Sequence, residues 1–320
     1  MSVVTPVYNG VDFLAECIES VLAQSYSNWE FIILDNCSKD GTHALAQSYA
    51  ARDARIKVVA ADAFVGQLPN FNRSLRLMSP HSKYCKMLLA DDWLFPHCLE
   101  EMVAVAESDA NVGLVGSYAM YRNHVSHFGL PYRRHAVFSG KEAACRYLLQ
   151  QQWFLGSPTC VLFRSDLVRA RDPFFAETGH PFADTQALIE LLKVSDFGFV
   201  FQLLTYNRRD NAGHWERIEA FEPMATENLM LLCQHGSAFL EPQELQRHLT
   251  RMKKNYYFML SDNALRRRGK AFWDFHRNAL AHIGWRFERR RLAWGITKRL
   301  GDMILNPKQT VERLLSQKDA

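Results

Sequence analysis

The first half of the chain alternates short apolar runs with stretches whose apolar residues recur at helical spacing. The runs that read as strands are 2–6, 31–34, 56–60, 84–89, 112–117 and 199–204. The helical stretches between them are 11–24, 40–52, 70–78 and 99–106. Strands that alternate with helices predict an α/β fold whose sheet is mostly parallel and has helices on both faces.

Two of the predicted strands end in acids. Asp35 follows the run 31–34, and Asp91 and Asp92 follow the run 84–89. Ligands of an open α/β sheet bind beyond the carboxyl ends of its strands, so these acids mark a candidate site. Neighbouring side chains on a strand point to opposite faces, so one acid of the pair faces a cleft while the other supports a loop. Taken alone, the pair favours a simpler interpretation, in which Asp92 caps the helix near Pro96.

Two common nucleotide-binding motifs are missing from the sequence. No G-x-G-x-x-G follows the first strand and no G-x-x-x-x-G-K-[ST] occurs, which disfavours a dinucleotide dehydrogenase and a P-loop NTPase. A nucleotide would then depend on Thr5, Tyr8, Asp35 and a divalent metal. Tyr8 would stack on the base, Asp35 would accept its hydrogens, and the ion would link the diphosphate to Asp91.

Four segments in register carry a family resemblance. They are Thr5-Pro6-Val7-Tyr8-Asn9-Gly10, Gln24-Ser25-Tyr26, Asp35-Asn36-Cys37-Ser38-Lys39-Asp40-Gly41-Thr42, and Ala90-Asp91-Asp92 followed by Pro96. In this order and spacing they resemble the family-2 glycosyltransferases of GT-A, Rossmann-like fold. The resemblance implies an inverting hexosyltransferase-type enzyme that uses Mn²⁺ or Mg²⁺ and a nucleoside-diphosphate sugar, with UDP favoured. It also implies a saccharide or lipid-linked acceptor and a role in cell-surface polysaccharide or glycoconjugate synthesis.

The resemblance also assigns roles to individual residues. Nucleotide binding falls on Thr5, Pro6, Tyr8, Asp35, Asn72, Arg73, Ala90 and Arg208. Metal binding falls on Asp91, with Asp92 and Asp210 in support, and Asp184 takes the place of the general base. Two of these assignments have structural alternatives. Asp184 precedes an apolar helical run and would suit an N-cap, and Asn72 with Arg73 would suit an ordinary amphipathic helix.

The chain departs from the family pattern at several positions. Leu89 replaces the first acid of the D-x-D motif, Asn36 and Cys37 replace an Asp and a Gly, and Ala183 replaces a Glu. These changes leave open a degenerate transferase that binds nucleotide-sugar without turnover.

The last third of the chain differs from the rest. Residues 216–320 are helical in pattern, and we expect them to form a basic extension to a transferase domain over 1–215. The segment 261–300 has eleven Lys and Arg against three acids, a net +8, which leaves −4 for the rest of a chain whose total is +4. Interleaved aromatics in 264–300 suggest contact with an anionic membrane surface. A helical pair with a solvated cationic face and a non-enzymatic scaffold remain alternatives, and nucleic acid ranks last because no such motif accompanies the charge.

The amino-acid composition indicates the broad class of protein and does not identify a reaction. The 320 residues are 48% hydrophobic and 22% charged, which is typical of a soluble globular protein. The seven cysteines form no C-x-x-C pair, and the histidines of 122–140 have no H-x-x-x-H spacing, which disfavours a zinc site. We expect a cytoplasmic protein without a secretory leader, peripheral at the inner membrane face at most.

Overall fold

The computed structural model describes residues 1–121, 123–127, 130–132, 136–150, 152–177, 182–208 and 220–305. The chain divides into two compact units, Met1–Gly213 and His214–Ala320, and each is described by itself. The predicted domain boundary at 215 lies outside the described residues.

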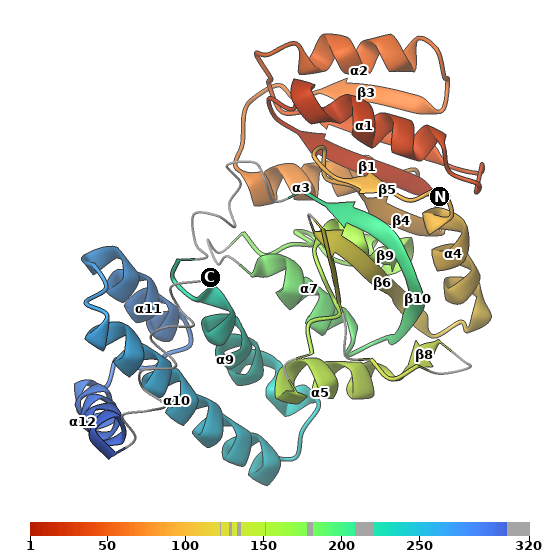
Figure 1. Ribbon diagram of the computed structural model, residues 1–320. Helices are drawn as coiled ribbons and strands as arrows, with labels where there is room; N and C mark the ends of the chain where they lie inside the picture. The colour runs from red at the N-terminus through yellow and green to blue at the C-terminus, as the bar shows by residue number, and fades with distance from the viewer. Residues whose placement is uncertain are drawn as a thin grey trace. The chain divides into compact units, whose positions relative to one another are not determined.

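The first unit is built on one mixed sheet (Figure 1). Its strands run in the order β3-β2-β1-β4-β9-β6-β10-β5, with β7 beside β6 and β8 beside β10. Their bounds are β1 Ser2–Val7, β2 Glu30–Asp35, β3 Ile56–Ala60, β4 Tyr84–Met87, β5 Trp93–Leu94, β6 Val112–Tyr121, β7 His124–Ser126, β8 Val137–Phe138, β9 Leu162–Arg164 and β10 Asp196–Asn207. The strands β1 to β4 are mutually parallel and so are β6 and β10, which confirms the mostly parallel sheet. The short strands β5, β7, β8 and β9 pair antiparallel.

Helices cover both faces of this sheet. They are α1 Val11–Leu22, α2 Thr42–Ala50, α3 Gln67–Arg76, α4 Cys98–Ser108, α5 Gly140–Gln150, α6 Ser165–Arg169 and α7 Ala183–Leu191. The chain steps outward from β1 to β3 and then returns to β4 on the other side of β1. Because crossovers between parallel strands are right-handed, this reversal puts α1 and α2 on one face and α3 on the other.

Apolar residues at the predicted positions form the core. All six residues of β1 are buried, and β2 is buried from its second residue onward. Leu14, Ile18 and Val21 of α1 pack in one cluster with Phe31 and Ile33 of β2. The helical spacing in 11–24 thus predicted the buried face, although α1 ends at Leu22.

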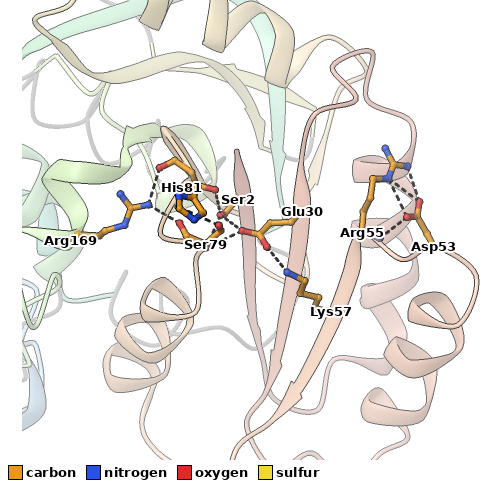
Figure 2. A network of polar contacts seen from close by, with 9 residues as sticks. Ser2, Glu30, Asp53, Arg55, Lys57, Ser79, His81 and Arg169 are labelled. Carbon is orange, nitrogen blue, oxygen red and sulfur yellow. Dashed lines mark hydrogen bonds and ion pairs between the residues drawn. The ribbon is translucent and has the colours of Figure 1, made fainter.

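A polar network joins the amino ends of the first strands (Figure 2). Glu30 accepts hydrogen bonds from the Ser2 hydroxyl at 2.6 Å and the Ser79 main-chain N–H at 2.9 Å, and its other oxygen pairs with Lys57 at 2.8 Å. Arg169 donates to the carbonyl oxygens of Ser79 and of Ser82. This network satisfies polar groups at the amino ends of the strands, and the acids Asp35 and Asp91 lie toward their carboxyl ends.

The strand predicted over 84–89 is shorter in the structure. The Leu88 N–H still bonds the Val4 carbonyl oxygen, but the Leu89 N–H turns to the Thr159 hydroxyl, so the chain leaves the sheet after Met87. A 3₁₀ turn at Pro158–Cys160 precedes β9.

The second unit is helical, as predicted for the extension. Its helices are α9 Pro223–His235, α10 Pro242–Leu265, α11 Lys270–His282 and α12 Arg289–Leu305, with a 3₁₀ turn at Gly236–Ala238. His276 of α11 is buried among them, and its Nδ1 lies 2.7 Å from the Tyr256 hydroxyl. Burial lowers the pKa of His276 to about 4. Within the described part of the chain, no helix has the length and apolar content needed to cross a membrane.

Candidate active site

The turns that follow β1 and β2 are bonded to each other. The Asn9 N–H donates to the Ser38 hydroxyl, and the Lys39 N–H donates back to Asn9 Oδ1, both at 2.8 Å. Asn9 has φ of +49°, a left-handed conformation that Asn tolerates better than most residues. The Gly10 N–H donates to the Thr42 hydroxyl at 2.8 Å. These bonds fix the carboxyl ends of β1 and β2 side by side.

Asp35 is the last residue of β2 and is buried at this junction. One oxygen accepts the Ser38 N–H at 3.3 Å, and the other lies 3.5 Å from Nδ1 of His43. The carboxylate therefore has remaining capacity to accept a hydrogen bond from a ligand.

Asn36 supports the loop that follows β3. Its amide nitrogen donates to the Val65 carbonyl oxygen at 2.8 Å, and its amide oxygen accepts the Val65 N–H at 3.1 Å. An Asp at this position would lack the donor half of this pair. The thiol of Cys37 reaches the Ala61 carbonyl oxygen at 3.3 Å, so both departures from the family pattern contact one loop.

Tyr8 projects at the end of this region. Its side chain is 46% exposed, and its ring lies 4.7 Å from that of Phe64, which is 58% exposed. Sequence reasoning missed Phe64. The available signal was an aromatic residue in the short connection between the predicted strand 56–60 and the predicted helix 70–78.

Asp91 and Asp92 differ in burial, although neither lies on a strand because β4 ends at Met87. Asp91 is half-buried, whereas Asp92 is buried and accepts three hydrogen bonds. The donors are the Thr159 hydroxyl at 2.5 Å, the Asn207 side-chain amide at 2.7 Å and the Arg208 N–H at 2.8 Å. Asp92 does not cap α4, whose N-cap is His97, so the capping interpretation was wrong because these donors take the Asp92 oxygens.

Burial raises the pKa of Asp92 well above its usual range, and the nearby charge of Asp91 raises it further. The hydrogen bonds from Thr159 and Arg208 oppose that shift. Thr159 and Asn207 come from distant parts of the chain, and no local sequence signal connects them with Asp92.

Arg208 lies beside the acid turn. Its Nε donates to the Asp91 carbonyl oxygen at 3.1 Å, and a terminal nitrogen pairs with Glu16 of α1 at 2.5 Å. The guanidinium also lies over the rings of Phe13 and Trp93, at 4.6 and 5.4 Å from their centroids. The guanidinium of Arg208 is therefore held beside the turn that carries Asp91, where its positive charge suits a phosphate.

Asp184 lies in the first turn of α7 and not at its N-cap, which is Phe182. One of its oxygens accepts the Thr185 N–H at 2.8 Å. Burial raises the pKa of Asp184, against the smaller opposite effect of that hydrogen bond. A carboxylate with a raised pKa is a better proton acceptor, which suits a general base.

Several other predicted residues have structural partners. Thr5 is buried and donates to the Leu88 carbonyl oxygen at 2.7 Å, and Pro6 is buried beside it. Asn72 is buried, and its amide both donates to and accepts from the backbone of Phe175. Arg73 donates to the Ala63 carbonyl oxygen at 2.9 Å. Ala90 is half-buried in the acid turn, and Asp210 lies outside the described residues.

The sheet topology brings part of the predicted site together. Asp35 and Asp91 follow parallel strands separated only by β1, and Tyr8 follows β1 itself. Arg208 joins them through its contact with the Asp91 carbonyl oxygen. Asp184 belongs to α7, which packs on β6, and its predicted place at the same pocket stays a prediction.

The metal requirement can be tested against the residues present. Among the described residues no group of three or more His, Cys, Asp or Glu side chains could hold an ion. Mg²⁺ in nucleotide sites uses one or two carboxylates, substrate phosphates and waters in place of a protein cage. A single carboxylate satisfies that requirement, and Asp91 can supply it. Asp92 is the less suitable of the two acids because its oxygens already accept three hydrogen bonds.

Comparison with known proteins agrees with this architecture. The model of Glycosyl transferase family 2 matches residues 2–171. The putative teichuronic acid biosynthesis glycosyltransferase TuaG of Bacillus subtilis is 39% identical over 92 residues, which are 29% of this chain and 36% of TuaG. The putative glycosyltransferase EpsE of the same organism is 37% identical over 118 residues, 37% of this chain and 42% of EpsE. The chain thus matches less than half the length of these relatives.

Two solved structures share the fold. S. aureus TarS residues 1–349 in complex with UDP-GlcNAc aligns with a TM-score of 0.64 at 17% identity, over 88% of this chain and 80% of that one. The mannosyltransferase PcManGT from Pyrobaculum calidifontis, in complex with GDP-Man and Mn²⁺, aligns with a TM-score of 0.55 at 12% identity, over 95% and 86%. Because the family model covers more than half of the residues and the sheet has the expected topology, the chain belongs to glycosyl transferase family 2.

Proposed function

We propose that the protein transfers a sugar from a nucleoside-diphosphate donor, with UDP favoured, to an acceptor hydroxyl in polysaccharide or glycoconjugate synthesis, with inversion at the anomeric carbon. The observation that carries the proposal is a cluster of four residues at the carboxyl ends of the strands β1, β2 and β4, namely Tyr8, Asp35, Asp91 and Arg208. These side chains match the two parts of a nucleoside diphosphate. The ring of Tyr8 and the carboxylate of Asp35 suit the base, and Asp91 and Arg208 suit a metal-bound diphosphate.

The chemistry follows from the properties of these groups. Tyr8 and Asp35 hold the base, and binding energy at this remote part orients the reacting carbon. Asp184 takes the proton of the acceptor hydroxyl as that oxygen attacks, and its raised pKa favours the transfer. Arg208 stabilises the negative charge of the departing diphosphate. A Mn²⁺ or Mg²⁺ ion held by Asp91 would add Lewis-acid stabilisation of the same charge.

A direct assay tests the proposal. The protein is incubated with UDP-GlcNAc and other UDP-, GDP- and dTDP-sugars in Mn²⁺ or EDTA, and release of the nucleoside diphosphate is measured with and without saccharide acceptors. Metal-dependent release supports a transferase. Nucleotide binding in a thermal-shift screen without release in any condition would point to the degenerate binder that Leu89, Asn36 and Ala183 leave open. The absence of any nucleotide-dependent shift would favour a non-enzymatic scaffold.

We also propose that the second unit contacts an anionic membrane surface. The helix α12 exposes Trp294, Leu300 and Ile304, the last at 78%, and carries Arg289, Arg290 and Lys298. Exposed apolar side chains beside cations are typical of helices that lie at a lipid interface.

Flotation with vesicles tests this contact. Wild-type protein is compared with a Leu300→Glu, Ile304→Glu double variant and with Val194→Glu, which changes a side chain of the first unit that is 67% exposed. We expect the double variant to lose binding to anionic vesicles and the Val194 variant to keep it. Equal flotation of all three proteins would reject the proposal.

A further inference from the structure

The ring of Phe64 lies against the ring of Tyr8. The two centroids are 4.7 Å apart with an interplanar angle of 57°, although both side chains are about half exposed to solvent. Exposed aromatic residues in contact with each other, beside a buried carboxylate with spare acceptor capacity, are well suited to a planar ligand.

The backbone on both sides of Phe64 is fixed. The Ala63 carbonyl oxygen accepts a hydrogen bond from Arg73, and Asn36 makes two hydrogen bonds with Val65. Cys37 reaches the Ala61 carbonyl oxygen at the start of the loop. The side chain of Phe64 is therefore presented by an anchored loop, and its rotation requires no change in these bonds.

The loop is also tied to Asp35. Asn36 follows Asp35 directly, and the Ala61 N–H donates to the Asp35 carbonyl oxygen at 2.8 Å. The carboxylate proposed to bind the base edge and the ring of Phe64 thus belong to one connected piece of structure. The backbone contacts of the loop therefore fix where the ring of Phe64 lies relative to the carboxylate of Asp35.

We propose that Phe64 is the second wall of a nucleobase clamp, a proposal that rests on the nucleotide-dependent function above. The base lies between the rings of Tyr8 and Phe64, with its N–H edge toward Asp35. Because the two rings are in contact, Phe64 swings aside to admit the base between them and then closes on the face of the base opposite Tyr8.

The clamp makes a specific prediction about binding. Stacking of one base on an aromatic side chain contributes roughly tenfold or more to affinity by alanine substitution. Phe64→Ala should therefore weaken binding of UDP with Mn²⁺ about tenfold, as measured by isothermal titration calorimetry. Phe64→Leu should weaken it nearly as much, because it keeps the apolar volume and loses the flat face. Phe64→Trp should bind UDP at least as well as wild type.

Two controls separate stacking from loop damage. Inorganic pyrophosphate with Mn²⁺ has no base, so its affinity should be the same for wild type and Phe64→Ala. Val194→Ala shortens an exposed apolar side chain elsewhere in the first unit and should leave UDP affinity unchanged.

The outcomes separate the clamp from the proposed function. If wild type binds UDP and Phe64→Ala binds it within twofold, or loses pyrophosphate affinity to the same degree, the clamp is refuted while the transferase proposal stands. If wild type binds no nucleoside diphosphate, both proposals fail.

Discussion

The main-chain N–H of Arg208 donates to Oδ1 of Asp92 at 2.8 Å, which joins the end of β10 to the acid turn after β4. The same Arg208 reaches back to the Asp91 carbonyl oxygen with its Nε. Asp92 therefore holds the backbone of Arg208, the proposed phosphate ligand, beside the turn that carries Asp91, the proposed metal ligand. A substitution of Asp92 should therefore lower the free energy of unfolding.

Asp92→Ala would leave buried donors of Thr159, Asn207 and Arg208 without their acceptor. Each unsatisfied buried donor costs about 1–3 kcal/mol when no water replaces the partner, so for three donors we expect a loss of at least about 3 kcal/mol in the free energy of unfolding. Urea denaturation measures this. Asp166→Ala, a change to a surface acid paired with Arg164, should cost less than about 0.5 kcal/mol. Equal effects of the two substitutions would contradict the positioning role.

Asp184→Asn should abolish transfer while leaving nucleotide binding nearly intact, since Asn keeps the shape and cannot accept a proton. The loss expected for a missing general base is about 10²–10⁴-fold in kcat. Nucleotide affinity, measured by calorimetry on the same protein, is the matched readout. If affinity and turnover fall together, Asp184 is not the base.

The pH dependence of transfer gives a second view of Asp184. A base must be ionised to act, and burial raises the pKa of Asp184 above its ordinary value. Activity should therefore fall as the pH is lowered through that raised pKa, at a higher pH than the value of about 3.9 for a free Asp would give. The profile of kcat/KM against pH tests this on the wild-type enzyme. An activity that stays flat down to the onset of acid unfolding would argue against a carboxylate base.

Asp91→Ala should remove the dependence on Mn²⁺ together with most of the activity. The ion supplies several kcal/mol of charge stabilisation, so a loss of roughly 10²–10³-fold is expected, with no recovery at high Mn²⁺. Asp91→Glu keeps an oxygen ligand and should recover activity partially as Mn²⁺ is raised. An Asp91→Ala protein that still responds to EDTA as wild type does would place the metal on other residues.

Local pattern predicted most of the first unit because its strands and helices bury the faces that their spacing indicates. Residues 11–24 and β1 and β2 are examples. The strand ends were harder to predict: β4 stops at Met87 because Leu89 finds a side-chain partner in Thr159, seventy residues away. Distant partners also explain why the capping interpretation of Asp92 was wrong and why the sequence left the role of Asn72 open. Their partners lie in other elements, which neither periodicity nor a family motif encodes.

Asn36 is the residue on which sequence and structure give the most different interpretations. From the sequence it is a missing acid that suggests reduced activity, whereas in the structure it makes a two-way hydrogen bond with Val65. Asn36→Asp restores the family residue and decides between them. If Asn36 is a brace, the variant loses the donor to the Val65 carbonyl oxygen and adds a charge next to Asp35. Hydrogen exchange of residues 61–66 should then rise, and UDP affinity should fall by up to about tenfold.

Asn111→Asp is the matched control, because it adds the same charge at an exposed position. It should change neither hydrogen exchange of the loop nor UDP affinity. The opposite result for Asn36→Asp, with unchanged loop protection and tighter Mn²⁺-dependent binding of UDP, would show that this position is a lost acid. The loop and Phe64 would then be held without Asn36, by Arg73 and Cys37.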